Sequence, residues 1–285
     1  MQSNKTIDSS WHPLVNGCPP VWASEWGQDR YGVWLAFTVK EVRQCLRWVP
    51  PGSFLMGSPA DEAGRLAEED LPHPVVIQSG FWLFDTPVTQ ALWQAVMGNN
   101  PSHFKSSQRP VESVSWDDAQ QFLHSLNQVY PELQLTLPSE IQWEYACRAR
   151  TDTATYAGPM EILGDNHAPV LDSIAWYGGN SGLDFELENG VNSSGWPDKQ
   201  YDHEQAGSHP VAKKRPNPWG LYDMLGNVWE WCGDDMRDDT QTTQRVVRGG
   251  SWSDDARDVR ATCRVCFSPG KRNINLGFRC ARVQI

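Results

Sequence analysis

The 285-residue sequence lacks any long apolar run. No stretch approaches the ~20 apolar residues of a membrane-spanning helix, and residues 1–14 lack the basic start and apolar run of a secretory signal. We therefore expect no membrane partner and a cytoplasmic location. Positive charge is also scarce, since the net charge is −11. An acidic chain repels phosphate backbones, so we expect no nucleic-acid partner.

The sequence also lacks the cysteine and histidine spacing of a zinc site and the paired cysteines of a disulfide framework. The seven cysteines are unevenly spaced, and Cys263 and Cys266 form a CxxC pair with no second pair beside it. A zinc site normally needs four ligands, and disulfides normally form in exported chains. The sequence therefore predicts reduced thiols and no zinc site.

Tryptophan, glycine and proline are abundant instead, at 15, 23 and 20 residues. Large rings among many turn formers predict a loop-rich fold in which aromatic side chains fill the space between irregular segments. We expect a polar lead-in over residues 1–30 and one domain over residues 31–285. Residues 151–218 show no clear periodicity, and residues 182–206 within them resemble an insertion.

Local patterns predict several strands and helices. Residues 31–49 alternate apolar and polar side chains, which predicts a strand. Ser, Thr and acidic residues mark helix starts. Three helices are expected, beginning after Thr89, Ser115 and Ser139. Short strands are expected near 54–57, 81–84, 226–232, 245–250 and 277–283. Acidic runs at residues 61–70 and 234–239 are expected to be solvated surface.

An ordered set of short motifs carries a family resemblance. It comprises FLMGS at 54–58, PVE at 110–112, VSWDDA at 114–119, LPSEIQWEYA at 137–146, GLYDM at 220–224, GNVWEW at 226–231, RGGSW at 248–252 and GFR at 277–279. In this order the set resembles the formylglycine-generating-enzyme (sulfatase-modifying factor) family over about residues 46–285. The resemblance implies an α+β class with a C-type lectin fold, rich in loops and short antiparallel strands.

The chemistry of that family depends on two cysteines after the Gly-Gly-Ser element. Thiolates suit copper(I) and serve as nucleophiles. The resemblance places these positions at Asp254 and Val259, so neither thiolate is present and no copper is expected. A second branch, which makes sulfoxides, uses a His triad from a separate helical domain. Seven scattered His and no room for such a domain argue against it. We therefore expect no enzymatic activity.

A calcium site is the family feature that the sequence retains. The resemblance implies ligation by the side chains of Asp223 and Glu230 and the backbone carbonyls of Gly226 and Val228. Hard oxygen ligands suit calcium. The alternative is that the two carboxylates only hydrogen-bond to loops.

The last forty residues resemble the variable region of proteins diversified by retroelements. In such proteins a variable segment lies between Gly-Gly-Ser-Trp and a terminal Gly-Phe-Arg. Randomised Asn codons ending in C cannot encode Lys, Glu, Gln, Met or Trp. At the chain average of 59 in 285, about five of the 23 residues at 253–275 would be of these types, yet only Lys271 is. We call residues 253–275 the variable segment.

The resemblance implies that the variable segment binds a protein or other macromolecule. The candidate ligand-binding residues are Ser253, Asp254, Asp255, Asp258, Cys263, Val265, Cys266, Phe267, Ser268, Asn273, Ile274 and Asn275. We expect them to be exposed on a rigid support, with the interleaved Arg257, Arg260 and Arg264, and Trp252 and Phe278, more buried. Two other hypotheses about function stay open: a divergent enzyme of the family and a regulatory interaction domain.

Overall fold

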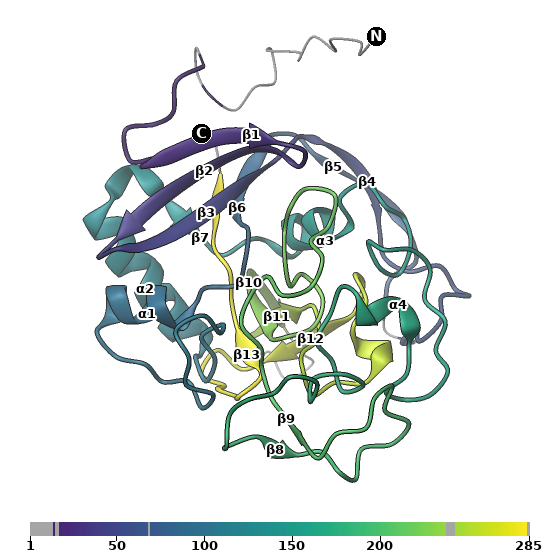
Figure 1. The fold of residues 1–285 in the computed structure, drawn as a ribbon. Coiled ribbons are helices and arrows are strands. Elements are labelled where there is room, and N and C mark those ends of the chain that lie inside the picture. The colour runs from purple at the N-terminus through teal and green to yellow at the C-terminus, as the bar shows by residue number, and fades with distance from the viewer. Residues whose placement is uncertain (1–13, 15–16, 68, 238–242, 284–285) are drawn as a thin grey trace, which may run out of the picture.

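Two sheets organise the chain, as Figure 1 shows. The computed structural model describes residues 14, 17–67, 69–237 and 243–283. The larger sheet has six strands in the order β1-β2-β3-β6-β14-β7, and the smaller has four in the order β12-β11-β10-β13. The strands of the larger sheet are β1 Glu25–Asp29, β2 Gly32–Val39, β3 Val42–Val49, β6 Phe81–Phe84, β7 Leu135–Thr136 and β14 Ala281–Val283.

The predicted strand at residues 31–49 is two strands, β2 and β3, in an antiparallel hairpin. The prediction was wrong at its centre because Lys40 and Glu41 form the turn, with positive φ of 44° and 71°. Such turns usually carry Gly, Asn or Asp, so the sequence shows no turn signal there. The predicted apolar face of β2 is buried, as expected. Strand β1, inside the predicted lead-in, pairs with β2 at the sheet edge.

Three helices begin at the predicted residues. Helix α1 (Gln90–Met97) follows Thr89, whose side chain accepts a hydrogen bond from the N–H of Leu92. Helices α2 (Trp116–Val129) and α3 (Glu140–Arg148) both start with a capping box, at Ser115 and Ser139. Helices α1 and α2 pack near the larger sheet, whereas α3 contacts β10 and β11 of the smaller sheet.

The smaller sheet is formed by strands from the C-terminal part of the chain. Its strands are β10 Trp229–Arg237, β11 Thr243–Arg248, β12 Arg264–Phe267 and β13 Leu276–Gly277. Strand β12 is an edge strand antiparallel to β11, and β13 runs parallel to β10 on the other edge. The variable segment therefore includes one edge strand and ends directly before the other.

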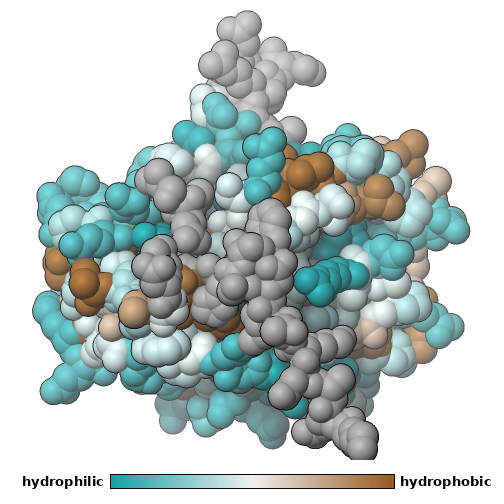
Figure 2. All heavy atoms as spheres, turned by 90° about the horizontal axis from the view of Figure 1, so that it is seen from above, coloured by the Kyte–Doolittle hydropathy of each residue, from teal (hydrophilic) through white to brown (hydrophobic). Residues whose placement is uncertain are grey.

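The remaining regular elements are short. They are β4 Gly52–Met56, β5 His73–Ile77, the 3₁₀ helices η3 Pro131–Leu133 and η4 Ala256–Asp258, α4 Pro169–Asp172, β8 Val191–Asn192 and β9 Gln205–Ala206. Residues 151–218 thus contain little regular structure, as expected. Figure 2 shows that, on the face seen from above, apolar residues form separate patches among hydrophilic ones. No helix in the described part of the chain is long and apolar enough to span a membrane.

Candidate functional site

A glycine pair leads the chain from β11 into the variable segment. Gly249 and Gly250 have positive φ of 103° and 72°. A Cβ on Gly250 would lie 2.9 Å from the carbonyl oxygen of Asp258 and from Cγ2 of Val259. Only glycine fits both this conformation and this spacing. The pair therefore holds the start of the variable segment tightly against its own next turn.

A polar junction joins the two ends of the variable segment. The Asn275 side-chain amide donates to the hydroxyl oxygens of Ser251 and Ser253, at 3.0 and 3.1 Å. The Ser251 hydroxyl in turn donates to the Asp254 carboxylate. Burial raises the pKa of Asp254 to about 6, although the Ser251 hydrogen bond lowers it. The predicted residues Ser253, Asp254 and Asn275 therefore lie together.

The two positions at which the family resemblance places cysteines, Asp254 and Val259, differ in their surroundings. Asp254 is half-buried in the polar junction, whereas Val259 is fully buried. The nearby Cys263 is also buried, and burial raises the pKa of its thiol to about 12. Burial raises the pKa of Cys266 as well. Both shifts favour the protonated thiol over the reactive thiolate.

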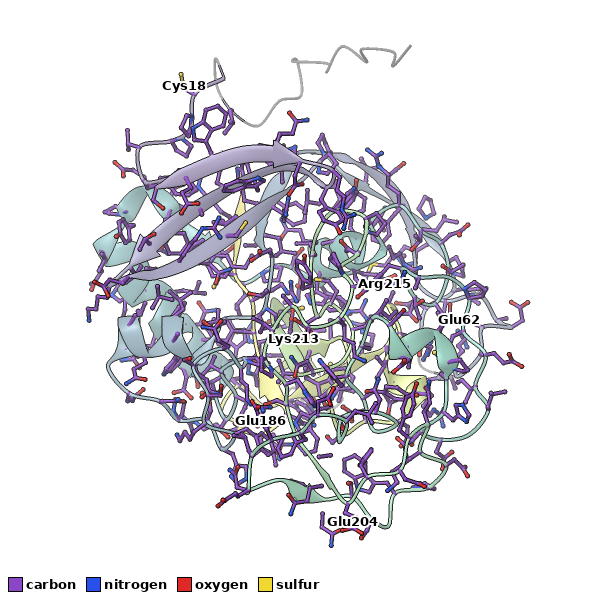
Figure 3. The ribbon with its side chains drawn as sticks, viewed as in Figure 1. Cys18, Glu62, Glu186, Glu204, Lys213 and Arg215 are labelled. Carbon is purple, nitrogen blue, oxygen red and sulfur yellow. The ribbon has the colours of Figure 1, made fainter. Side chains whose placement is uncertain are left out.

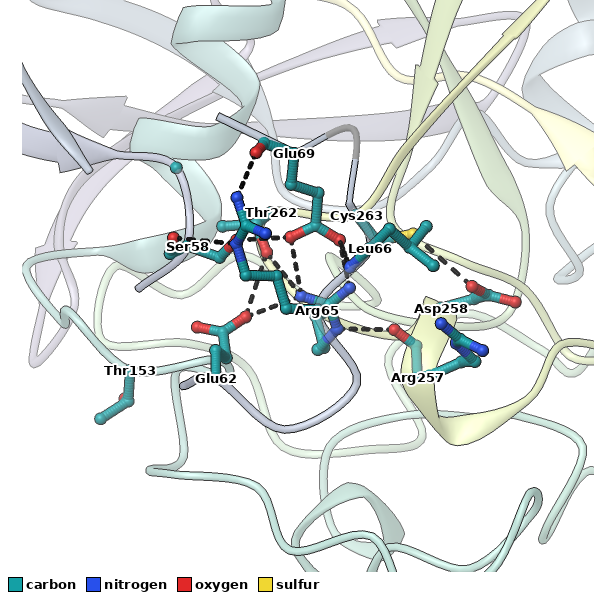
Figure 4. Close-up of polar contacts among 12 residues, drawn as sticks. Ser58, Glu62, Arg65, Leu66, Glu69, Thr153, Arg257, Asp258, Thr262 and Cys263 are labelled. Atoms are coloured by element: carbon teal, nitrogen blue, oxygen red, sulfur yellow. Dashed lines mark hydrogen bonds and ion pairs between the residues drawn. The ribbon is translucent and has the colours of Figure 1, made fainter. Parts of the chain in front are cut away.

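A buried ion-pair cluster supports the middle of the variable segment (Figure 4). Arg260 is fully buried and donates to Glu62 at 2.7 Å and to both carboxylate oxygens of Glu69. Its Nε donates to the backbone carbonyl of Arg257 at 2.6 Å. Thr262 donates to Glu62 at 3.2 Å. The loop at residues 58–70 is thereby fixed to a segment almost 200 positions later in the chain.

This cluster corrects the expectation that the acidic run at residues 61–70 is solvated. The side chains of Glu62 and Glu69 are only 6% and 3% exposed, because Arg260 pairs with both. Asp61 and Asp70 are exposed, as expected. In the second run, Asp235 is exposed, while Asp238 and Asp239, like Glu68 in the first, lie outside the described residues.

Other arginines tie the same segment to helix α3. Arg264 donates to Glu140 at 2.7 Å, and Arg248, fully buried, contacts Glu144 and Glu140. Arg260, Trp252 and Phe278 are buried, as predicted, and Arg264 is half-buried. The expectation was wrong for Arg257, which is exposed. Arg257 contributes its backbone carbonyl to the cluster, as the acceptor of the Arg260 Nε hydrogen bond.

The twelve candidate ligand-binding residues are mostly partly accessible. Only Cys263 is buried, while Ser268 and Asn273 are fully exposed. The other nine are half-buried: Ser253, Asp254, Asp255, Asp258, Val265, Cys266, Phe267, Ile274 and Asn275. Phe267 and Ile274 pack against core clusters on one side and are partly accessible on the other.

The loop at residues 182–206 contributes aromatic side chains beside the variable segment, which the sequence did not reveal. Trp196 stacks on Trp252 with ring centroids 6.1 Å apart, and Phe104 meets the same ring edge-on at 5.3 Å. Ile274 packs against this cluster too, and its carbonyl accepts from the Trp252 indole N–H at 3.3 Å. A lone Trp in an irregular loop gives no periodic signal, so only the packing shows that it lies here.

The predicted calcium ligands are buried, and their oxygens differ in availability. One oxygen of Asp223 accepts from the N–H of Ala212 at 2.7 Å, while its other oxygen, Oδ1, is buried without a hydrogen-bond partner. Both Glu230 oxygens accept from Arg279 at 2.7 Å, and one also accepts from the Trp143 indole. Within the described residues, no cluster of three or more His, Cys, Asp or Glu side chains could hold a metal ion.

We propose that calcium binds at Asp223 Oδ1 with the carbonyls of Gly226 and Val228, and that Glu230 shares its charge with Arg279. Burial raises the pKa of Asp223 to about 6, against a hydrogen bond from Ala212. This pKa is above the unfolded value of 3.8. The protonated acid therefore contributes fully to the stability of the folded state below about pH 4, and this contribution is lost as pH rises through 6. A cation offsets the cost of the buried carboxylate only when the acid is ionised.

Chelation should therefore lower the melting temperature by several degrees at pH 7.5 and much less at pH 5, because a ligand of the native state stabilises by mass action. Calorimetry with and without chelator checks this, with an Asp223→Ala variant, which lacks the ligating oxygen, as the control that should not respond. Identical melting curves at pH 7.5 with and without chelator would rule the site out.

The chain has a C-type lectin fold of the formylglycine-generating-enzyme type, which includes the segment between Gly249 and Phe278. This fold belongs to the α+β class, as the sequence predicts. The chain belongs to the family of the sulfatase-modifying factor enzyme 1-like domain, whose model matches residues 37–284.

Named relatives fall in more than one functional class. The chain is 31% identical to bovine (Bos taurus) inactive C-alpha-formylglycine-generating enzyme 2 over 72% of this chain and 60% of that protein. It is 28% identical to the formylglycine-generating enzyme of Mus musculus over 73% of this chain and 53% of that protein. The chain thus spans a little over half of these two relatives. Treponema denticola variable protein 1 has a similar structure, with a TM-score of 0.68, 29% identity and coverage of 88% of this chain and 99% of that one.

Proposed function

We propose that this chain is a non-catalytic ligand-binding protein whose variable segment is a diversified surface on a C-type lectin scaffold. The observation that carries the proposal is the separation of accessible and buried residues within that segment, where Ala256 and residues 259–263 are buried and every other position is at least partly accessible. Eleven of its twelve candidate positions are at least partly accessible, while Trp252, Arg260 and Thr262 between or beside them are buried and paired. Such a segment can change its surface residues while its support stays constant.

The chemistry of the segment supports binding rather than catalysis. Asp254 and Val259 supply neither a thiolate nucleophile nor a soft metal ligand, and burial raises the pKa of the thiols of Cys263 and Cys266, which favours their protonated forms. Semi-exposed Phe267 and Ile274 are suited to anchor a macromolecular partner, because large side chains near the centre of an interface carry much of its energy. The likeness to a variable protein and to a relative named inactive agrees with this proposal.

A pair of libraries tests the proposal. The first randomises Ser253, Asp255, Ser268 and Asn273, and the control randomises Trp252, Arg260, Thr262 and Phe278. Exposed positions normally change stability by no more than about 0.5 kcal/mol each, whereas core changes cost several times more. We expect most members of the first library and few of the second to fold, as measured by protease resistance on a display system.

The same first library, selected on unrelated protein targets, should yield binders that differ only at those four positions. Equal loss of folding in both libraries would contradict the proposal, because the variable segment would then be an ordinary part of the core. A regulatory domain with one fixed partner would instead fold in the first library and yield no new binders.

A further inference from the structure

A separate cavity of about 520 Å³ lies outside the variable segment. Its walls include Trp176, Glu186, His209, Lys213 and Lys214. Glu186 and Lys213, both labelled in Figure 3, line this cavity. A volume of this size falls within the roughly 300–1,000 Å³ of small-molecule sites.

A buried arginine with unsatisfied donors, which does not itself line the cavity, pairs with Glu186 in one wall. Arg109 is fully buried, and none of its three guanidinium nitrogens has a hydrogen-bond partner. Its nearest acid is Glu186, 3.7 Å away, whose side chain is 71% exposed. The guanidinium lies 5.2 Å from the ring centroid of Phe185. A buried cation without hydrogen bonds is costly, so this position favours an acceptor that Glu186 only partly provides.

The other walls supply a rigid neutral face and two further cations. The His209 ring stacks on Trp176 at 3.7 Å, and its Nε2 lies 2.8 Å from the carbonyl oxygen of Ser181. A carbonyl only accepts, so Nε2 carries the proton. Burial lowers the pKa of His209 to about 4, which keeps the ring neutral near pH 7. Lys214 lies 3.9 Å from the Trp176 ring on the cavity wall, and Lys213 is exposed on its rim.

We propose that this cavity binds a carboxylate group of a small ligand or peptide side chain, which takes the place of Glu186 at Arg109. The planar guanidinium fork matches a carboxylate in two parallel hydrogen bonds. The Glu186 side chain is mostly exposed, so it can swing into solvent without a backbone change. Asp184 and Glu186 on the same rim oppose a polyanion, which restricts the site to a single acidic group.

Titration with butyrate, which carries a single carboxylate, followed by tryptophan fluorescence and by NMR of the His209 ring, tests the site. Glu186→Gln removes the competing carboxylate and should tighten binding about tenfold, because hydrogen bonds to a charged group are strong. Lys213→Gln should weaken it several-fold. Arg109→Met should abolish binding without loss of stability, because an apolar side chain of similar volume can replace a buried charge. Arg215→Gln, an exposed cation outside this cavity, is the matched control and should bind like the wild type.

Wild-type affinity in the Glu186→Gln and Lys213→Gln variants would overturn the proposal, and both positions are exposed, so these variants should fold even if Arg109→Met does not. Inorganic phosphate serves as a second probe. Binding of phosphate as tight as that of butyrate, with no response to Glu186→Gln, would show general anion attraction and would also overturn it. None of these binding measurements depends on the variable segment.

Discussion

Glu69→Ala should lower the free energy of unfolding by about 3–5 kcal/mol, the usual cost of removing one partner of a buried ion pair. Arg260 would keep its charge at a fully buried position, where, among the described residues, Glu62 and Thr262 remain as its polar side-chain partners. Burial alone would raise the pKa of Glu69, but hydrogen bonds from Arg260 and Ser58 outweigh it and lower the pKa to about 2. Since this is below the unfolded value, the stabilisation is present above about pH 4.5 and is lost as pH falls towards 2.

Urea unfolding at pH 7 and pH 3 measures this effect. The matched control is Asp118→Ala, which breaks the exposed pair with Arg272, whose side chain is 55% exposed. Exposed pairs contribute about 0–1 kcal/mol, but Asp118 also completes the capping box of α2, so about 1–2 kcal/mol is expected. Equal losses in the two variants, or a Glu69→Ala effect that does not shrink at pH 3, would contradict the role assigned to the Arg260 cluster.

Arg279→Ala should be the most destabilising single change in the Gly-Phe-Arg element, again by about 3–5 kcal/mol. Arg279 is fully buried and donates to both oxygens of Glu230 and to the carbonyls of Phe84, Tyr222 and Asp223. Its loss leaves Glu230, which is 1% exposed, with the Trp143 indole as its remaining side-chain donor.

A double-mutant cycle separates the ion pair from simple loss of packing. Glu230→Leu with Arg279→Met replaces both charges by apolar groups of similar length. The double variant should be more stable than Arg279→Met alone, because no buried charge is left unpaired. Additive losses in the cycle would show that the two side chains do not depend on each other.

Local features of this fold could be predicted because they depend on neighbouring residues. Thr89, Ser115 and Ser139 begin their helices through hydrogen bonds to N–H groups only three positions away. In β2, alternating apolar and polar residues mark the buried face, because successive side chains of a strand point to opposite sides. The hairpin turn at Lys40 and Glu41 escaped detection because its residues are unusual for their conformation.

Distant pairings could not be predicted in the same way. The acidic loop at 58–70 looks solvated in sequence, and only the fold brings Arg260 against Glu62 and Glu69. Trp196 and Arg109 take their places through packing between segments far apart in the chain, which no local pattern encodes. The composition of the variable segment pointed to a binding surface, but its half-buried anchors became apparent only when the core clusters were known.

The central claim, a diversified surface, is tested most directly by sequencing the locus in many cells of the source population. The account predicts a reverse-transcriptase gene nearby, a near-copy of the codons for residues 245–285, and differences between cells confined to codons of the accessible positions in the variable segment. The codons for Trp252, Arg260 and Phe278 should be invariant. A single fixed sequence in every cell, with no second copy of this stretch nearby, would contradict the account.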